Sequence, residues 1–334
     1  MYAEAGEAER YRQDAAGTTA GRSAGHTAAH TVMDRAGHTG AGRTLAVVLN
    51  WCAEEDTERC LASLLHECER VPTLDLLLVD SASPDGSGAR LAARFPAVPY
   101  LALTANLGYA GGNEQAIGWA LARCYDFVLI VNDDAEIMAG CVEQLLETMA
   151  ANPTAGACAP TVTFGPPHTD RVWWAGGAFV WWKGLGVHWH DGESVAALGL
   201  SGRAPQPVTF LSGCVLLLRS HAIRQSGSLR AEFFAYVEDA ELSYRWQRDG
   251  WQLYWVPAAL ARHHVPRHAG APSPFAIRYR DRNRRRVASL HYGVWQRAVF
   301  WLFFAPSRFL RLVQYALKAD GARAMAVWRG WFGR

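Results

Sequence analysis

The chain has 334 residues, half of them apolar, so it can bury a sizeable core in one large domain or two small ones. Its formal net charge is only +2, which argues against a general polyanion binder, and no nucleic-acid partner is expected. The seven cysteines include no C-x-x-C pair and are odd in number. They are therefore expected to be reduced thiols of a cytoplasmic protein.

Residues 1–43 are rich in Ala, Gly, Thr, His and Arg and poor in large apolar side chains. This composition predicts a disordered tail without a signal peptide. Nowhere does the chain reach the roughly 18 to 20 consecutive apolar residues that span a bilayer. The nearest candidate, residues 298–304, is followed closely by Pro306, Arg308 and Arg311 and is interpreted as an interfacial segment.

From residue 44 onwards, short apolar runs alternate with segments of helical spacing. The runs at 45–51, 74–80, 98–104 and 126–132 have the character of buried strands. The helical segments are expected at 56–69, 88–95, from the glycine-rich turn NLGYAGG to about residue 123, and at 139–150. Strands that expose neither face to solvent and that alternate with helices predict an α/β fold with a mostly parallel central sheet flanked by helices.

Polar side chains follow these strands at the points where the strands end: Asn50, Asp80, Asn106, and the pair Asp133 and Asp134. Ligands of open α/β sheets bind at the carboxyl ends of the strands. The sequence therefore predicts a ligand site at this edge of the sheet.

The second half is more mixed, with strand-like segments at 156–164, 208–219 and 251–257. The tryptophan-rich stretch 172–190 suits a hairpin or a loop over a cleft. Residues 232–250 run into an amphipathic helix that stops at Gly250. Residues 44–270 are interpreted as one domain, followed by amphipathic, basic and aromatic helices at 271–334.

Two acidic pairs are candidates for chemistry. Asp133 and Asp134 could hold a divalent cation, although a solvated turn with a helix cap is an equally good interpretation. Glu238 and Asp239 precede a helix, where one carboxylate could accept a proton or simply cap the helix.

The other candidate features are weaker. His263 and His264 could ligate a metal, but a histidine is more often structural. The turn after Asn106 lacks the G-x-G-x-x-G spacing of dinucleotide sites. The arginine run 278–286 is more often a solvated face than a specific site.

Taken together, the motifs resemble those of the family 2 glycosyltransferases with the GT-A fold, especially the rhamnosyltransferase-like branch, over residues 44–290. The matching pieces are LAVVLNW at 45–51, VDSASPDGS at 79–87, NLGYAGGNE at 106–114, VNDDA at 131–135, GSLRAEFFAYVEDAELSYR at 227–245, GWQLYWVPAALARH at 250–263, and Arg282 with Asn283. Ser81, Glu114 and Asp133 depart from the family pattern and leave donor preference open.

The resemblance implies roles by position. Asp239 matches the catalytic base and Glu238 its acidic neighbour. Asp134 matches the metal-ligating carboxylate, and His263 matches the histidine that completes the metal site. Asp80 is expected to contact the base or ribose of the donor. The residues assigned to the donor pocket are Asn50, Asp80, Asn106, Gly111, Gly112, Asn113, Asp133 and Arg282.

These roles predict an inverting glycosyltransferase that uses a dTDP- or UDP-linked sugar and Mg²⁺ or Mn²⁺. The acceptor is expected to be a glycan or a lipid-linked precursor of a cell-envelope polysaccharide, reached by peripheral contact with the inner face of the cell membrane. A sugar nucleotidyltransferase is the rival enzyme, although the first strand is followed by NWCAEED and not by a glycine-rich, lysine-bearing loop. The non-enzyme rival is a degenerate, membrane-associated assembly partner.

Overall fold

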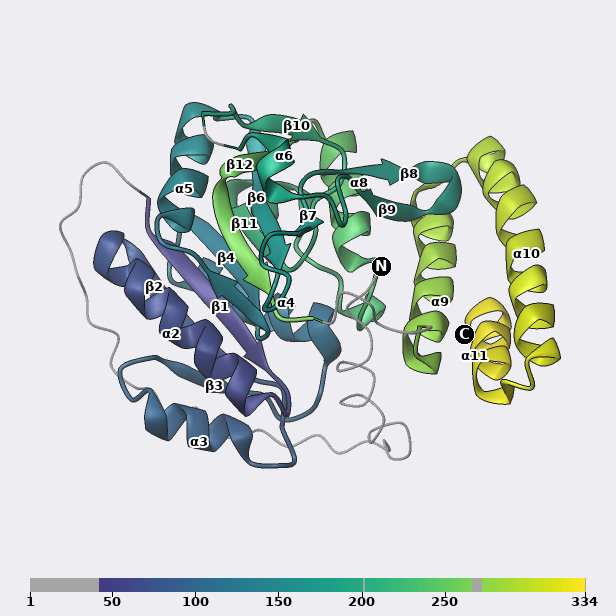
Figure 1. Cartoon of the computed structure of the whole chain (residues 1–334), viewed down its shortest axis with the longest axis horizontal. Coiled ribbons are helices and arrows are strands. Elements are labelled where there is room, and N and C mark those ends of the chain that lie inside the picture. Colours follow the sequence, from purple (N-terminus) through teal and green to yellow (C-terminus); the bar gives the residue numbers. More distant parts are fainter. Residues whose placement is uncertain (1–41, 201, 266–271, 334) are drawn as a thin grey trace.

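The computed structural model describes residues 42–200, 202–265 and 272–333. Most of the predicted disordered tail, and the predicted domain boundary at residue 270, lie outside these residues. Figure 1 shows a twisted sheet covered by helices, with three C-terminal helices standing together at one end of the molecule.

The first half forms the parallel part of the sheet. Its strands are β1 (Thr44–Asn50), β2 (Leu74–Asp80), β3 (Tyr100–Ala102) and β4 (Phe127–Asn132). They pair in parallel in the order β3-β2-β1-β4. The apolar residues of β1, β2 and β4 are almost all buried, which explains why these strands read as continuous hydrophobic runs.

Helices cover both faces of this sheet. They are α2 (Glu54–Arg70), α3 (Ser87–Arg94), α4 (Gly108–Ala122) and α5 (Cys141–Ala151). α2 packs against β1 and β2 and also touches α3 and α5, so these three helices share one face. α4 joins β3 back to β4 on the other side of β1, and the right-handed crossover places it on the opposite face.

The second half extends the sheet with antiparallel pairing. β6 (Ala155–Phe164) and β4 both pair antiparallel with β11 (Val215–Arg219), whereas β12 (Gln252–His263) runs parallel to β6. The short strands β5 (Ala135–Ile137), β7 (Val172–Trp174) and β10 (Gln206–Val208) pair with β12, β6 and β12, respectively. The α/β fold class with a helix-flanked central sheet is thus confirmed, and its antiparallel pairs gather around β11 and β12.

Two strand predictions in this half need correction. The segment 208–219 is not one strand, because β10 ends at Val208 and β11 begins at Val215. The residues between them are mostly buried and form no strand. Among them, the Gly213 amide donates to the Asp239 carboxylate. β12 continues six residues past Pro257, because a register shift between Val256 and Leu260 takes the proline off the β6 ladder.

The tryptophan-rich stretch forms a hairpin. β8 (Gly177–Val180) and β9 (Leu185–His188) pair antiparallel, with the short 3₁₀ turn η1 (Trp181–Lys183) between them. Gly184 closes the turn at a φ of +60°, which a residue with a side chain rarely adopts. The one-turn helix α6 (Val195–Leu198) follows.

The remaining elements lead to the C-terminus. They are α7 (Ser220–Ser226), the 3₁₀ turn η2 (Ala231–Phe233), α8 (Glu238–Arg248), α9 (Pro274–His291), α10 (Val294–Leu317) and α11 (Gly321–Phe332). α11 packs against both α9 and α10, and η1 also touches α10. Among the described residues, no helix combines the length and apolar character that crossing a membrane requires.

Candidate functional site

Asp134 and His263 meet although they are far apart in sequence. β4 ends at Asn132, and the chain turns through Asp133 and Asp134 into β5. β5 then pairs antiparallel with the end of β12, which sets His263 opposite Ala135. As a result, His263 Nε2 lies 3.0 Å from Asp134 Oδ1, and both side chains are buried.

The surroundings of His263 favour its charged form when no metal is bound. Burial alone lowers the pKa of an imidazole, but the Asp134 carboxylate overrides this effect and holds the pKa of His263 well above its usual range. The Trp173 ring packs edge-on against His263, with centroids 4.4 Å apart. The two side chains thus form a rigid pair of one nitrogen and one carboxylate donor.

Asp239 lies in the first turn of α8, and backbone amides fix its carboxylate. Oδ2 accepts from Gly213 N at 3.0 Å, and Oδ1 accepts from Ala240 N at 2.7 Å. Burial raises the pKa of Asp239, although these amides and the nearby Arg280 partly offset the rise. A carboxylate with a raised pKa is a better proton acceptor.

The loop before Asp239 is strained and is braced from α9. Phe234, Tyr236 and Val237 all have φ between 63° and 73°, a region that costs non-glycine residues about 1 to 3 kcal/mol each. The buried Asn283 Nδ2 donates to the carbonyls of Phe233, Ala235 and Tyr236 at 2.7–2.9 Å. This side chain therefore holds the loop that aims Asp239.

Arg282, predicted to contact the donor, is engaged with the same loop. Its Nη2 donates to the carbonyls of Glu232 and Phe233, and its Nε donates to Asn283 Oδ1. The guanidinium of Arg282 therefore helps to hold the Asn283 side chain in place.

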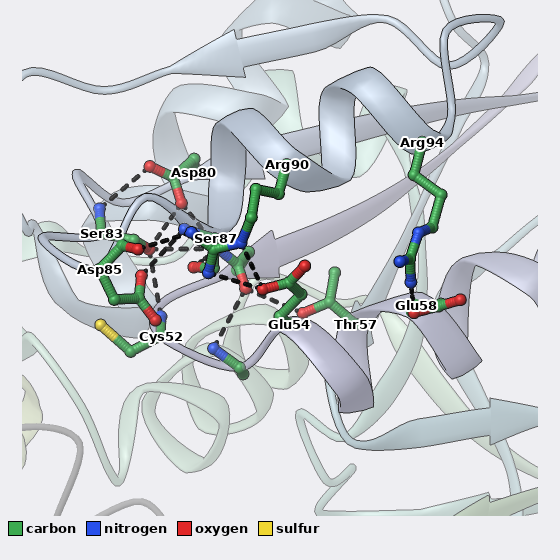
Figure 2. Close-up of polar contacts among 12 residues, drawn as sticks. Cys52, Glu54, Thr57, Glu58, Asp80, Ser83, Asp85, Ser87, Arg90 and Arg94 are labelled. Atoms are coloured by element: carbon green, nitrogen blue, oxygen red, sulfur yellow. Dashed lines mark hydrogen bonds and ion pairs between the residues drawn. The ribbon is translucent and has the colours of Figure 1, made fainter.

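Asp80 belongs to a compact polar network, shown in Figure 2. The in-register pairing of β1 and β2 places Asn50 beside Asp80, and Asn50 Nδ2 donates to Asp80 Oδ1 at 2.7 Å. Asp80 also accepts from the amide and hydroxyl of Ser83. Gly88 lets α3 begin directly against this carboxylate, because a Cβ there would lie 2.3 Å from Asp80 Cγ.

The glycine-rich turn brings α4 close to its neighbours. Asn106 Oδ1 accepts from Gly108 N at 2.8 Å and so starts the helix. A Cβ on Gly111 would lie 2.8 Å from Leu107 Cβ, and one on Gly112 would lie 2.7 Å from the Leu49 methyl groups. Asn113, also on α4, is buried and donates to its own helix through Tyr109 O.

One cavity of about 700 Å³ joins several of these groups. Its lining includes Asn132, Glu238, Asp239 and His263. The hairpin contributes further lining residues, among them His188. Asp239 of α8 and Asp134, in the turn after β4, are about one hundred residues apart. Asp239 lines the cavity, and Asp134 is linked to it through His263.

Some residues of the candidate site were not identified by the sequence-based prediction. His188 was hidden in the tryptophan-rich stretch, and burial lowers its pKa to about 3, so it is neutral near pH 7. The Gly213 amide lies within a segment predicted as strand, where the dipeptide Ser212-Gly213 was the available signal of a turn. Asn283 was noted only as part of a motif.

The metal-binding capacity of the site is limited to a pair of donors. In the part of the chain that the structure describes, no group of three or more His, Cys, Asp or Glu side chains is arranged to hold a metal ion. Asp134 and His263 offer one oxygen and one nitrogen, and a Mg²⁺ or Mn²⁺ ion usually takes only one or two protein carboxylates, with substrate phosphates filling the remaining positions.

Comparisons with known proteins identify similar glycosyltransferases. Two relatives from Mycobacterium tuberculosis, strains CDC 1551 / Oshkosh and ATCC 25618 / H37Rv, are described as N-acetylglucosaminyl-diphospho-decaprenol L-rhamnosyltransferase. Each is 28% identical over 261 residues, which covers 73% of this chain and 83% of the relative.

A solved structure, GalNAc-T7 with UDP, GalNAc and Mn²⁺, superimposes with a TM-score of 0.59 at 14% identity. The match covers 79% of this chain and 50% of the solved one, so this chain spans half of that protein's length, and the likeness shows the fold.

Two family matches overlap along the chain. Residues 46–190 match glycosyl transferase family 2, and residues 127–325 match glycosyl transferase family group 2. The second match alone extends over more than half of the chain and includes Asp134, Asp239 and His263. The chain therefore belongs to the family 2 glycosyltransferases and is a glycosyltransferase of the rhamnosyltransferase-like kind.

Proposed function

We propose that this glycosyltransferase inverts the anomeric centre of a nucleotide-activated sugar in a single displacement, with Asp239 as the base. The observation that supports this most is that Asp239 and His263, the partner of Asp134, line the same cavity. Donor diphosphate and acceptor hydroxyl can then lie on opposite sides of one sugar ring.

Asp239 takes the proton. The acceptor oxygen forms a bond to the anomeric carbon while the bond from that carbon to the diphosphate breaks, and the hydroxyl proton passes to the Asp239 carboxylate. The amides of Gly213 and Ala240 orient this carboxylate, and burial makes it more basic. The nucleoside diphosphate leaves on the face opposite to the attack, which inverts the configuration.

Asp134 and His263 would hold a divalent cation. Their donor set fits, because a carboxylate oxygen and an imidazole nitrogen lie 3.0 Å apart at the wall of the cavity. When bound, such an ion would supply positive charge to stabilise the departing diphosphate. Binding would displace the proton that His263 otherwise keeps, so the affinity for the metal should rise with pH.

We assign the donor nucleoside to the position beside Asp80, at the carboxyl end of β2. A dTDP- or UDP-linked sugar is the proposed donor. The relatives described as acting on N-acetylglucosaminyl-diphospho-decaprenol favour a lipid-linked acceptor.

The C-terminal helices fit a peripheral position at the inner face of a membrane. Large apolar side chains are exposed on α10, notably Trp295 at 76%, Leu302 at 68% and Leu310 at 67%. From residue 274 onwards the chain carries only two acidic residues, Asp281 and Asp320, among many arginines. Exposed apolar and basic groups on one helical unit favour the interface of an anionic bilayer.

The test is Asp239→Asn, which keeps the shape of the side chain and removes the base. Sugar transfer should fall about 10²- to 10⁴-fold, while binding of the nucleotide sugar by calorimetry stays unchanged. The pKa of Asp239 is raised by folding, so its ionised form destabilises the native state at neutral pH. The variant gains from removal of this charge but loses one of the two amide hydrogen bonds, so its melting temperature should stay within a few degrees of the wild type.

Asp249→Asn, at the exposed C-terminal end of the same helix, is the matched control and should transfer normally. Undiminished turnover by Asp239→Asn would remove this residue from the role of base. Donor binding without any hydrolysis or transfer by the wild type would favour the degenerate assembly partner, and formation of a nucleotide sugar from a sugar phosphate would favour the nucleotidyltransferase.

A further inference from the structure

The C-terminal helices also contribute to the lining of this cavity. Four of the lining residues are arginines: Arg280 and Arg284 from α9, and Arg308 and Arg311 from α10. We refer to these four residues as the arginine cluster. They come from two helices that do not carry the proposed catalytic groups, so their convergence on the same cavity calls for a separate explanation.

The buried part of the arginine cluster has more positive than negative charge. Arg284 and Arg308 are largely buried, with 11% and 17% of their side chains exposed. Both face a single carboxylate, Asp281, whose Oδ1 lies 3.6 Å from Arg284 Nη1 and 2.7 Å from Arg308 Nη1. One carboxylate for two buried guanidiniums leaves a net charge that an anionic ligand would stabilise.

The pKa values reflect this imbalance. Burial, together with the charge of Arg308, lowers the pKa of Arg284 to about 10 in spite of Asp281. Burial also raises the pKa of Asp281, although the neighbouring arginines lower it. A phosphate close to the guanidiniums would raise the pKa of Arg284 again, because it adds negative charge beside this side chain.

Arg280 links the arginine cluster electrostatically to the proposed base, Asp239. Its charge lowers the pKa of Asp239, so the two side chains are electrostatic neighbours across the cavity. An anion held by the arginines would therefore lie next to the acceptor hydroxyl. The nucleotide's own diphosphate is assigned elsewhere, beside Asp134 and His263.

The cavity wall also includes apolar side chains. Phe303 lines the cavity and is 50% exposed on α10, next to Leu302 in the sequence. The wall therefore contains a base, cations and an exposed apolar side chain. A lipid-linked sugar diphosphate has a part that matches each of these: a hydroxyl on the sugar, the diphosphate and the hydrocarbon chain.

On this basis we propose that Arg280, Arg284, Arg308 and Arg311 form a subsite for the diphosphate of a lipid-linked acceptor, separate from the subsite for the donor diphosphate. Guanidinium groups suit this role because their paired N–H donors match phosphate oxygens. The assignment of this anion to the acceptor rests on the proposed function, whereas the anion subsite itself can be tested without turnover.

The first experiment titrates inorganic pyrophosphate into the full-length protein by calorimetry, in EDTA and without donor. The wild type should bind, and Arg280→Gln and Arg311→Gln should each weaken binding about tenfold, because each removes one charge-assisted contact. Arg329→Gln, on the exposed face of α11 and outside the cavity lining, is the control and should bind like the wild type.

Pyrophosphate binding that is equal in the wild type and all three variants would overturn the subsite. So would full displacement of pyrophosphate by UDP or dTDP, which would place it in the donor site. Displacement by phosphatidylglycerol vesicles that Arg311→Gln weakens would assign the arginines to lipid headgroups and not to the acceptor. None of these outcomes depends on whether the protein transfers sugar.

The second experiment compares a short-chain sugar diphosphate lipid with the same sugar on an alkyl glycoside. Arg311→Gln should raise the KM for the diphosphate acceptor about tenfold, with an unchanged donor KM and no effect on the alkyl glycoside. An equal loss on both acceptors would show a general structural role and would contradict the proposal.

Discussion

Two parts of the candidate site are built in different ways. At the proposed donor position, Asp80 follows a buried strand and is held by Asn50, Ser83 and the close approach of α3, all within about forty residues of chain. At the proposed base, Asp239 follows a loop of unfavourable φ angles that Asn283 braces from a helix more than forty residues away. Regular βα units can place a carboxylate by themselves, whereas a strained loop needs a distant partner.

The largest effect should come from breaking that distant partner. Asn283→Asp keeps the shape of the side chain but turns an amide donor into a carboxylate facing three carbonyls. Loss of these buried hydrogen bonds should lower the free energy of unfolding by about 2 to 4 kcal/mol, measured by urea denaturation. Sugar transfer should fall as well, because the loop carries Asp239.

The control for this substitution is Asn152→Asp. In the wild type, the half-buried Asn152 side chain donates to a single carbonyl, that of Thr148. It should cost less than about 1 kcal/mol. If both variants were equally stable, the loop before Asp239 would not depend on α9.

A second variant probes the donor side. Gly88→Ala places a methyl group 2.3 Å from Asp80 Cγ, so the carboxylate or α3 must shift. Overpacking of this kind costs about 1 to 3 kcal/mol, and donor KM should rise with it. Gly118→Ala, with nothing within 4 Å of the new methyl on α4, should leave donor KM unchanged and stabilise the helix by about 0.5 to 1 kcal/mol. A normal donor KM in Gly88→Ala would show that Asp80 is not part of the donor site.

The membrane contact predicts a smaller effect. Leu310→Gln should reduce co-sedimentation with anionic vesicles a few-fold, because less apolar area enters the interface. Its melting temperature should match the wild type, since the side chain is 67% exposed. Equal sedimentation of the variant and the wild type would show that this face of α10 lies away from the bilayer.

The smallest expected effect is a shift in the pH profile. Activity needs the ionised form of Asp239, so it should fall as the pH drops through a pKa that burial holds above the ordinary 3.8. Arg280 lowers this pKa, so Arg280→Gln should move the acidic limb of kcat upward by less than about one pH unit. A downward shift would contradict the electrostatic link between Arg280 and Asp239.

The regular half was largely predictable from the sequence. Its apolar runs and helical segments lie within a few residues of β1, β2, β4 and the helices between them. The carboxylates and amides that follow these runs do gather at one edge, because parallel strands end together. Burial on both faces of a sheet produces continuous apolar runs, which can be recognised in the local sequence.

The family resemblance had assigned Asp134 and His263 to one site, but only the tertiary structure shows what brings them and the remaining groups together. The contact between Asp134 and His263 depends on β5, a strand of three residues with no recognisable pattern, and on its register with β12. The bracing by Asn283 and the convergence of four arginines join helices to loops and to a cavity wall across long stretches of chain. Such contacts arise from the packing of finished elements, so neither spacing nor composition marks them in advance.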